Sequence, residues 1–72
     1  MTRLGPRSSS WALAYLRGRA IAFNRGTVTQ ANLHGGIRLA VRCGASVEEA
    51  QNVLASHGLA WDPERRQITR ME

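Results

Sequence analysis

The first 47 residues contain no aspartate or glutamate, and the whole chain of 72 residues has no lysine and one cysteine, Cys43. A single cysteine excludes an internal disulfide, and Cys43 lacks the clustered Cys and His neighbours that zinc sites use. The longest uncharged apolar run, Trp11 to Leu16, is far shorter than the ~20 residues that cross a bilayer. We therefore expect no metal, no cofactor and no membrane partner.

Charge is segregated along the chain. Seven arginines precede residue 48, whereas all five acids follow residue 47 together with three more arginines. Residues 1–47 thus carry +7 and residues 48–72 carry −2, which sums to the formal net charge of +5. Such a segment attracts polyanions or an acidic protein surface. Arginine suits phosphate because its guanidinium offers two parallel donors, although codon usage explains the missing lysine equally well.

The length predicts one domain with a marginal core, which self-association would help to stabilise. Gly5-Pro6 breaks any helix, so residues 1–9 are predicted to be a basic N-terminal arm and residues 10–72 a single domain. Residues 1–25, rich in Arg and Ser, also have the composition of a mitochondrial transit peptide, which is a competing interpretation.

A first helix is expected from about Ser10 to Asn24, capped by one of the preceding serines and ended by Gly26. Apolar residues occupy two sides of this helix. One side is predicted to enter the core and consists of Leu13, Leu16, Ala20 and Phe23. The other is predicted to be a homodimer or partner interface and consists of Trp11, Ala14, Tyr15, Gly18 and Ala22.

The remaining segments follow from caps and turns. Thr29 can cap a helical turn over residues 30–34, and Gly35-Gly36 is expected to interrupt it before a firmer helix over residues 37–43. Ser46 and Glu49 form a capping box for a third helix that Gly58 closes. Residues 59–70 are predicted to form a hairpin around a type I turn at residues 62–65.

Residues 39–53 resemble the helix-turn-helix unit of small DNA-binding proteins. The matching positions are Leu39, Ala40, Gly44, Ala50 and Val53, with Ser46 at the start of the second helix. Ala40 must be small because the helices cross there, and Gly44 permits a left-handed turn. With one helix before it and a hairpin behind it, the chain resembles a minimal winged helix. The expected fold class is mainly α, a three-helix helix-turn-helix-like domain with a C-terminal two-stranded β-hairpin, the wing.

The resemblance implies that the second helix of the unit enters the major groove of DNA. Gln51 and Asn52 on that helix would then reach adenine edges. Glu48 and Glu49 would face phosphates at a cost in affinity, and we favour for them a capping role at the helix N-terminus.

Phosphate contacts are expected from arginines on several segments. Arg38 and Arg42 share a helical face, Arg65 and Arg66 lie at the hairpin tip, and basic arms enter minor grooves in other proteins. Any one of these arginines is otherwise a solvated charge. The full predicted nucleic-acid site comprises Arg3, Arg7, Arg38, Arg42, Ser46, Gln51, Asn52, Arg65 and Arg66.

The first functional hypothesis is a small, dimeric, cytoplasmic DNA-binding transcriptional regulator of bacterial or phage origin. The second is a phage- or plasmid-type inhibitor that docks on a larger host protein. The third is a nonspecific RNA or nucleic-acid binder that uses Arg17, Arg19 and Arg25. An enzyme is not expected, because neither His34 nor His57 has a visible nucleophile or carboxylate partner.

Phe23 and Trp61 are predicted to pack in the core, because aromatic residues at helical spacing are more often buried than exposed for stacking on bases.

Overall fold

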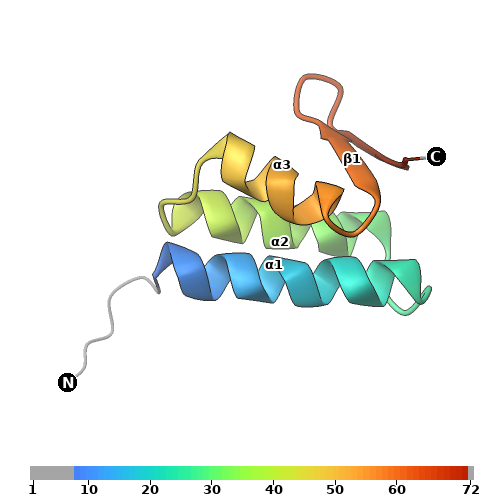
Figure 1. Ribbon diagram of the computed structural model, residues 1–72, viewed down its shortest axis with the longest axis horizontal. Coiled ribbons are helices and arrows are strands. Elements are labelled where there is room, and N and C mark those ends of the chain that lie inside the picture. The colour runs from blue at the N-terminus through green and yellow to red at the C-terminus, as the bar shows by residue number, and fades with distance from the viewer. Residues whose placement is uncertain (1–7, 72) are drawn as a thin grey trace.

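The computed structural model describes residues 8–71, which form three helices followed by a hairpin (Figure 1). The helices α1 (Ser9–Asn24) and α2 (Gln30–Arg42) run antiparallel side by side, α3 (Val47–Ala55) lies across them, and the hairpin stands at the end of α3. This confirms a mainly α domain with a C-terminal two-stranded hairpin. The arm predicted at residues 1–9 lies outside the described residues, except for Ser8 and Ser9. The elements are α1 (Ser9–Asn24), α2 (Gln30–Arg42), α3 (Val47–Ala55), β1 (Leu59–Asp62) and β2 (Gln67–Arg70).

Each helix begins where a hydroxyl side chain can accept from an unpaired backbone N–H. Ser8 caps α1, so this helix starts one residue before the expected position. Thr29 caps α2 in a reciprocal box with Asn32. Before α3, the Glu49 N–H donates to the Ser46 hydroxyl at 3.0 Å and the Ser46 N–H donates to the Glu49 carboxylate at 2.8 Å. The predicted capping box is therefore confirmed.

The prediction that Gly35-Gly36 interrupts the second helix is wrong. α2 is one continuous helix from Gln30 to Arg42. The physical reason is the packing at Gly36, which is buried against α1. A Cβ at this position would lie 3.3 Å from the Leu16 Cδ1 and 3.4 Å from the Arg19 Cγ. The helix keeps the glycine because the close contact with α1 outweighs its poor helix propensity.

The turn between α2 and α3 has the expected backbone. Gly44 adopts a φ of 103°, which residues with a Cβ rarely adopt. The Ala45 N–H then donates to the Ala40 carbonyl at 3.0 Å, which satisfies a carbonyl at the end of α2.

The core lies between the three helices and one face of the hairpin. Of the predicted α1 stripe, Leu16 and Ala20 are fully buried, and Leu13 and Phe23 are partly buried against the core. Ala12 is also fully buried, although it was not predicted to belong to this stripe. The buried apolar residues are Ala12, Leu16, Ala20, Leu33, Ile37, Ala40, Ala45, Ala50, Leu54, Leu59 and Ile68.

The hairpin is antiparallel, with Trp61 opposite Ile68. Leu59 and Ile68 are buried and Trp61 packs against the core from the same face, as the alternation of side chains along a strand requires. Every helix in residues 8–71 is too short or too polar to cross a membrane.

The two adjacent glycines of α2 make a matched pair of variants. Gly35→Ala should raise the free energy of unfolding by about 0.5–1 kcal/mol, because its Cβ enters open space and alanine favours the helix. Gly36→Ala should be about 1–3 kcal/mol less stable than Gly35→Ala, since fully buried Leu16 has little room to move. Urea denaturation measures both, and equal stabilities would rule out the tight contact between α1 and α2.

Candidate nucleic-acid interface

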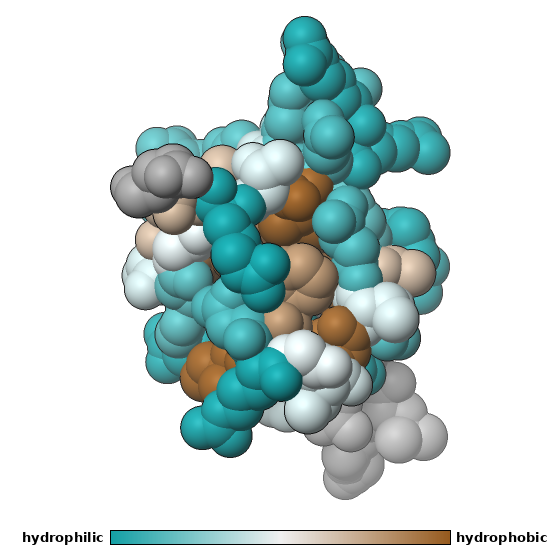
Figure 2. Space-filling view, turned by 90° about the vertical axis from the view of Figure 1, so that its right-hand side faces the viewer, coloured by the Kyte–Doolittle hydropathy of each residue, from teal (hydrophilic) through white to brown (hydrophobic). Residues whose placement is uncertain are grey.

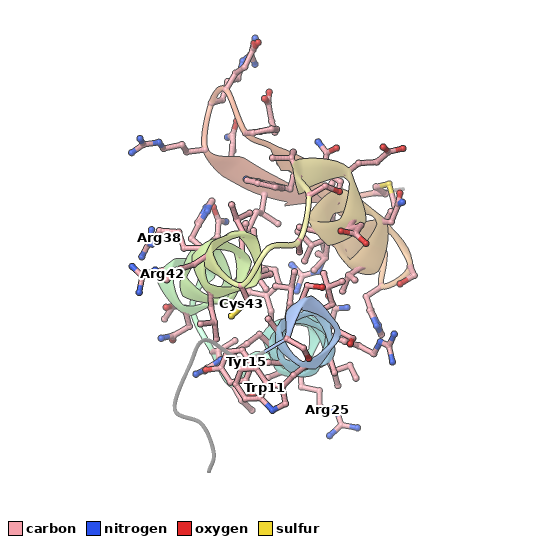
Figure 3. All side chains as sticks on the ribbon, turned by 90° about the vertical axis from the view of Figure 1, so that its left-hand side faces the viewer. Trp11, Tyr15, Arg25, Arg38, Arg42 and Cys43 are labelled. Atoms are coloured by element: carbon pink, nitrogen blue, oxygen red, sulfur yellow. The ribbon has the colours of Figure 1, made fainter. Side chains whose placement is uncertain are left out.

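Arg38 and Arg42 project together from the exposed side of α2. They are one helical turn apart, and Figure 3 shows both side chains pointing away from the bundle on the same side. Neither has an ion-pair or hydrogen-bond partner in residues 8–71. Arg25, at the end of α1, points to a different side of the molecule. The predicted pair on α2 is thus available to an external anion.

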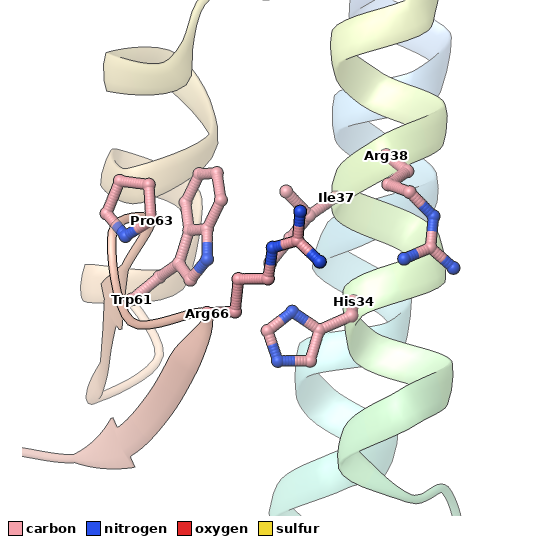
Figure 4. A pocket seen from close by; sticks show the side chains of 6 residues that line it. All are labelled: His34, Ile37, Arg38, Trp61, Pro63 and Arg66. Carbon is pink, nitrogen blue, oxygen red and sulfur yellow. The ribbon is translucent and has the colours of Figure 1, made fainter.

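A groove separates α2 from the hairpin, and we call it the α2–hairpin groove. One compartment is a pocket of about 240 Å³ next to the hairpin loop. Arg38 lines this pocket from α2, and Arg66 lines it from the hairpin, as Figure 4 shows. The pocket is lined by His34, Ile37, Arg38, Trp61, Pro63 and Arg66.

The second compartment is more open and more apolar, with a volume of about 410 Å³. It shares Ile37, Arg38 and Trp61 with the first pocket and extends toward the α2–α3 turn. Val41 and Val47 complete its apolar wall and are 42% and 43% exposed, respectively. Arg42 lies at its edge. The groove therefore combines an apolar floor with a rim of arginines.

All charged residues that line the two compartments are arginines. Among the described residues the single ion pair joins Arg65 to Asp62 at 3.8 Å, on the exposed hairpin loop. Asp62 also accepts from the backbone N–H groups of Glu64 and Arg65, which fixes the turn. No carboxylate therefore lines the groove, although Asp62 and Glu64 stand at the same hairpin turn.

The acid-free segment does not form one continuous basic face. Arg19 is half-buried and donates to the Tyr15 hydroxyl, with its guanidinium 5.0 Å from the Tyr15 ring centre. Arg17 lies two residues away on α1 and therefore on nearly the opposite side of that helix. The prediction of Arg17, Arg19 and Arg25 as a joint RNA-contact surface gains no support from this arrangement.

The side chains predicted to read bases on α3 differ in their availability. The Gln51 amide donates to the Trp61 carbonyl at 3.3 Å, so Gln51 is half-buried and connects α3 to β1. A base-reading role requires an exposed side chain, and the prediction that Gln51 is exposed on α3 is wrong because the hairpin packs closely on this helix. Asn52 is exposed, as is Glu48. Ser46 is exposed, but its hydroxyl oxygen caps α3.

The other predicted contacts are distributed as follows. Arg3 and Arg7 lie outside the described residues. Arg65 and Arg66 stand on the hairpin loop, which projects from the body as a hydrophilic tip in Figure 2. On the end of the molecule that Figure 2 faces, hydrophobic residues show only as small, separate areas.

Trp61, Val41 and Val47 were not predicted to line a groove, and the structure places all three there. A signal was present in α2, where Ile37 and Val41 are spaced by four residues, directly beside Arg38 and Arg42 with the same spacing. Two neighbouring stripes of this kind predict an apolar surface with a basic edge. Trp61 was assigned to the core, and it serves both the core and the groove.

No protein-family model, curated protein or solved structure matches this chain. Within residues 8–71, no group of three or more His, Cys, Asp or Glu side chains is placed to hold a metal ion.

Arg66 is the only non-glycine among residues 8–71 with a positive φ, 53°. Left-handed backbone costs a residue with a Cβ roughly 1–2 kcal/mol. Arg66→Gly should therefore stabilise the domain by about 0.5–1 kcal/mol, although glycine also loosens the unfolded chain. Thermal unfolding followed by circular dichroism measures the change. Arg65→Gly, without a positive φ to relieve, should lower the melting temperature, and a parallel response of both variants would contradict the assignment of strain to residue 66.

Proposed function

We propose that this chain is a small DNA-binding transcriptional regulator that contacts phosphates through the α2–hairpin groove. The observation that carries the proposal is the convergence of three arginines, Arg38, Arg42 and Arg66, from two separate elements. None of the three has an acidic partner in residues 8–71, and no acid lines the groove. Several unpaired guanidiniums on one side of a small protein favour a polyanionic ligand.

The proposed mode differs from the one that the helix-turn-helix resemblance implies. α3 contains no arginine and begins with Glu48 and Glu49. If α3 entered the major groove, these carboxylates would approach phosphates. α2 and the hairpin loop supply the positive charge instead. We therefore propose that they contact the phosphate backbone of DNA on either side of one DNA groove. Asn52 remains the exposed base-reading candidate on α3.

We also propose that the regulator is a homodimer that associates through the outer face of α1. This face contains Trp11 and Tyr15, whose rings stack with centroids 5.6 Å apart, and the exposed Ile21. Ala14, Gly18 and Ala22 complete the face, and their small side chains allow a second helix to approach. Figure 3 shows Trp11 and Tyr15 on a different side from Arg38 and Arg42, so a dimer would leave the basic groove accessible. Action on DNA would place the protein in the cytoplasm.

One observation favours a second candidate function. Val41 and Val47 give the groove an exposed apolar wall, which phosphates do not need. An acidic segment of a host protein with apolar residues would fit this wall and the arginine rim together. This is the inhibitor interpretation, and it makes a different prediction about salt and DNA.

The double variant Arg38→Ala/Arg42→Ala tests the DNA proposal directly. Because each phosphate contact contributes roughly −0.9 to the slope of log K against log salt, losing two contacts should reduce the slope by about 1.8. DNA affinity should fall by about tenfold or more at low salt. Fluorescence anisotropy with a labelled duplex, repeated over a range of salt concentrations, measures both quantities. The variant should remain folded, because both side chains are exposed.

The matched control is Arg17→Ala/Arg25→Ala, which removes the same charge from exposed positions on α1 and at its C-cap. The control should keep nearly the wild-type slope. Equal losses in both double variants would show that net charge alone attracts DNA. If the wild-type protein binds no duplex at physiological salt, the DNA proposal is contradicted and the inhibitor interpretation is favoured.

Gly18→Leu tests the proposed dimer. A Cβ at this position meets nothing within 4 Å, and Gly18 is exposed, so the monomer should tolerate leucine and gain helix propensity. Leucine would hold two α1 helices apart, so sedimentation velocity should show a dimer for the wild-type protein and a monomer for the variant. If both sediment alike, the outer face of α1 is not the dimer interface.

A further inference from the structure

The indole N–H of Trp61 is a polar group without an explanation in the fold. Its Nε1 is shielded from solvent and has no hydrogen-bond partner among the described residues. Buried donors in native structures are nearly always paired, and an unpaired one often marks a missing ligand or water. Trp61 itself packs against the core through its ring and lines both compartments of the groove.

The surroundings of this N–H are positively charged. Figure 4 shows Nε1 on the edge of the indole that faces the pocket, with the Arg66 side chain extending past it toward α2. Arg38 stands on the opposite wall, and His34, one turn earlier on α2, adds an imidazole donor. Four groups that can donate hydrogen bonds thus surround about 240 Å³ of space, and no carboxylate lines it.

The hairpin loop brings Arg66 to the pocket. Arg66 holds a left-handed conformation, with φ 53°, as the last loop residue before β2. This backbone conformation belongs to the hairpin turn, and it fixes the point from which the Arg66 side chain extends. Arg66 is exposed, so its flexible side chain can adjust to a ligand in the pocket.

We propose that the pocket between His34, Arg38, Trp61 and Arg66 is a binding site for one phosphate group. A tetrahedral phosphate presents oxygens in several directions and can accept from Trp61 and from guanidiniums on opposite walls at once. A carboxylate presents two oxygens in one plane and satisfies fewer of these donors. Ile37 and Pro63 leave an apolar surface for the sugar carbons beside a phosphodiester. The assignment of a DNA phosphate to this pocket rests on the proposed function, whereas binding of free phosphate does not.

The indole N–H is a direct probe of occupancy. The chain contains two tryptophans, so a ¹⁵N-labelled sample gives two indole signals, which Trp11→Phe assigns. Titration with inorganic phosphate, at ionic strength held constant with chloride, should shift the Trp61 signal downfield to a plateau and leave the Trp11 signal in place. An unchanged Trp61 signal, or equal shifts of both signals, would overturn the site. A response to acetate as strong as the response to phosphate would overturn the phosphate assignment in favour of a carboxylate.

A pair of neighbouring variants tests the role of the pocket arginine. Arg66→Asn should weaken phosphate binding by about tenfold, and asparagine tolerates the left-handed backbone at this position. Arg65→Asn removes the same charge from the adjacent residue, which pairs with Asp62 and does not line the pocket, and should bind phosphate like the wild type. Equal effects of the two variants would overturn the specific role of Arg66.

A labelled duplex separates this inference from the proposed function. If the duplex binds and shifts the Trp61 indole signal as phosphate does, both are supported. If the duplex binds with a steep salt dependence but leaves the Trp61 signal unchanged, the DNA-phosphate assignment is overturned and the DNA-binding function is supported. If inorganic phosphate shifts the signal but no duplex binds, the function is overturned and the pocket is supported as a site for free phosphate.

Discussion

The contact between α1 and α2 at Gly36 determines where the candidate site lies. The backbone of α2 approaches Leu16 and Arg19 so closely that a methyl group would be crowded. Once Gly36 faces α1, the helical period places Ala40 in the core and turns Arg38 and Arg42 outward. The continuity of α2 through Gly35-Gly36 matters equally, because a break there would separate His34 from Arg38. The direction of the arginine pair thus follows from helix packing.

The second wall of the groove depends on how the hairpin is attached. Leu59 and Ile68 are buried against the helices, and the Gln51 amide holds the backbone of β1 at Trp61. On the far side, the Arg70 guanidinium lies 5.0 Å from the Phe23 ring centre. Because a two-stranded ribbon is marginal by itself in water, these contacts to α1 and α3 are what fix the position of the loop that bears Arg66.

Local signals predicted the helix starts, the capping box at Ser46 and the hairpin, because each depends on a few neighbouring residues. The interruption at Gly35-Gly36 was predicted wrongly, since propensity cannot register a close contact with a residue twenty positions earlier in the chain. The same limit applies to the site. Arg38 and Arg42 were predictable from their spacing, whereas the participation of Trp61 was not, because the sequence gives no measure of how far the hairpin stands from α2. Gln51 shows the converse. The helical pattern of α3 predicts an exposed side chain there, whereas the contact with the Trp61 carbonyl leaves it half-buried.

Two unfavourable features meet at the pocket of Trp61 and Arg66. An unsatisfied buried donor costs about 1–3 kcal/mol, and a left-handed arginine costs roughly 1–2 kcal/mol more. A domain of this size has only a marginal core from which to offset such losses. Two unpaired arginines on the adjacent α2 add electrostatic repulsion without a compensating carboxylate. Violations of local rules are expected at functional or strained sites. Their coincidence at one pocket of a groove lined by three arginines therefore favours a ligand as the explanation.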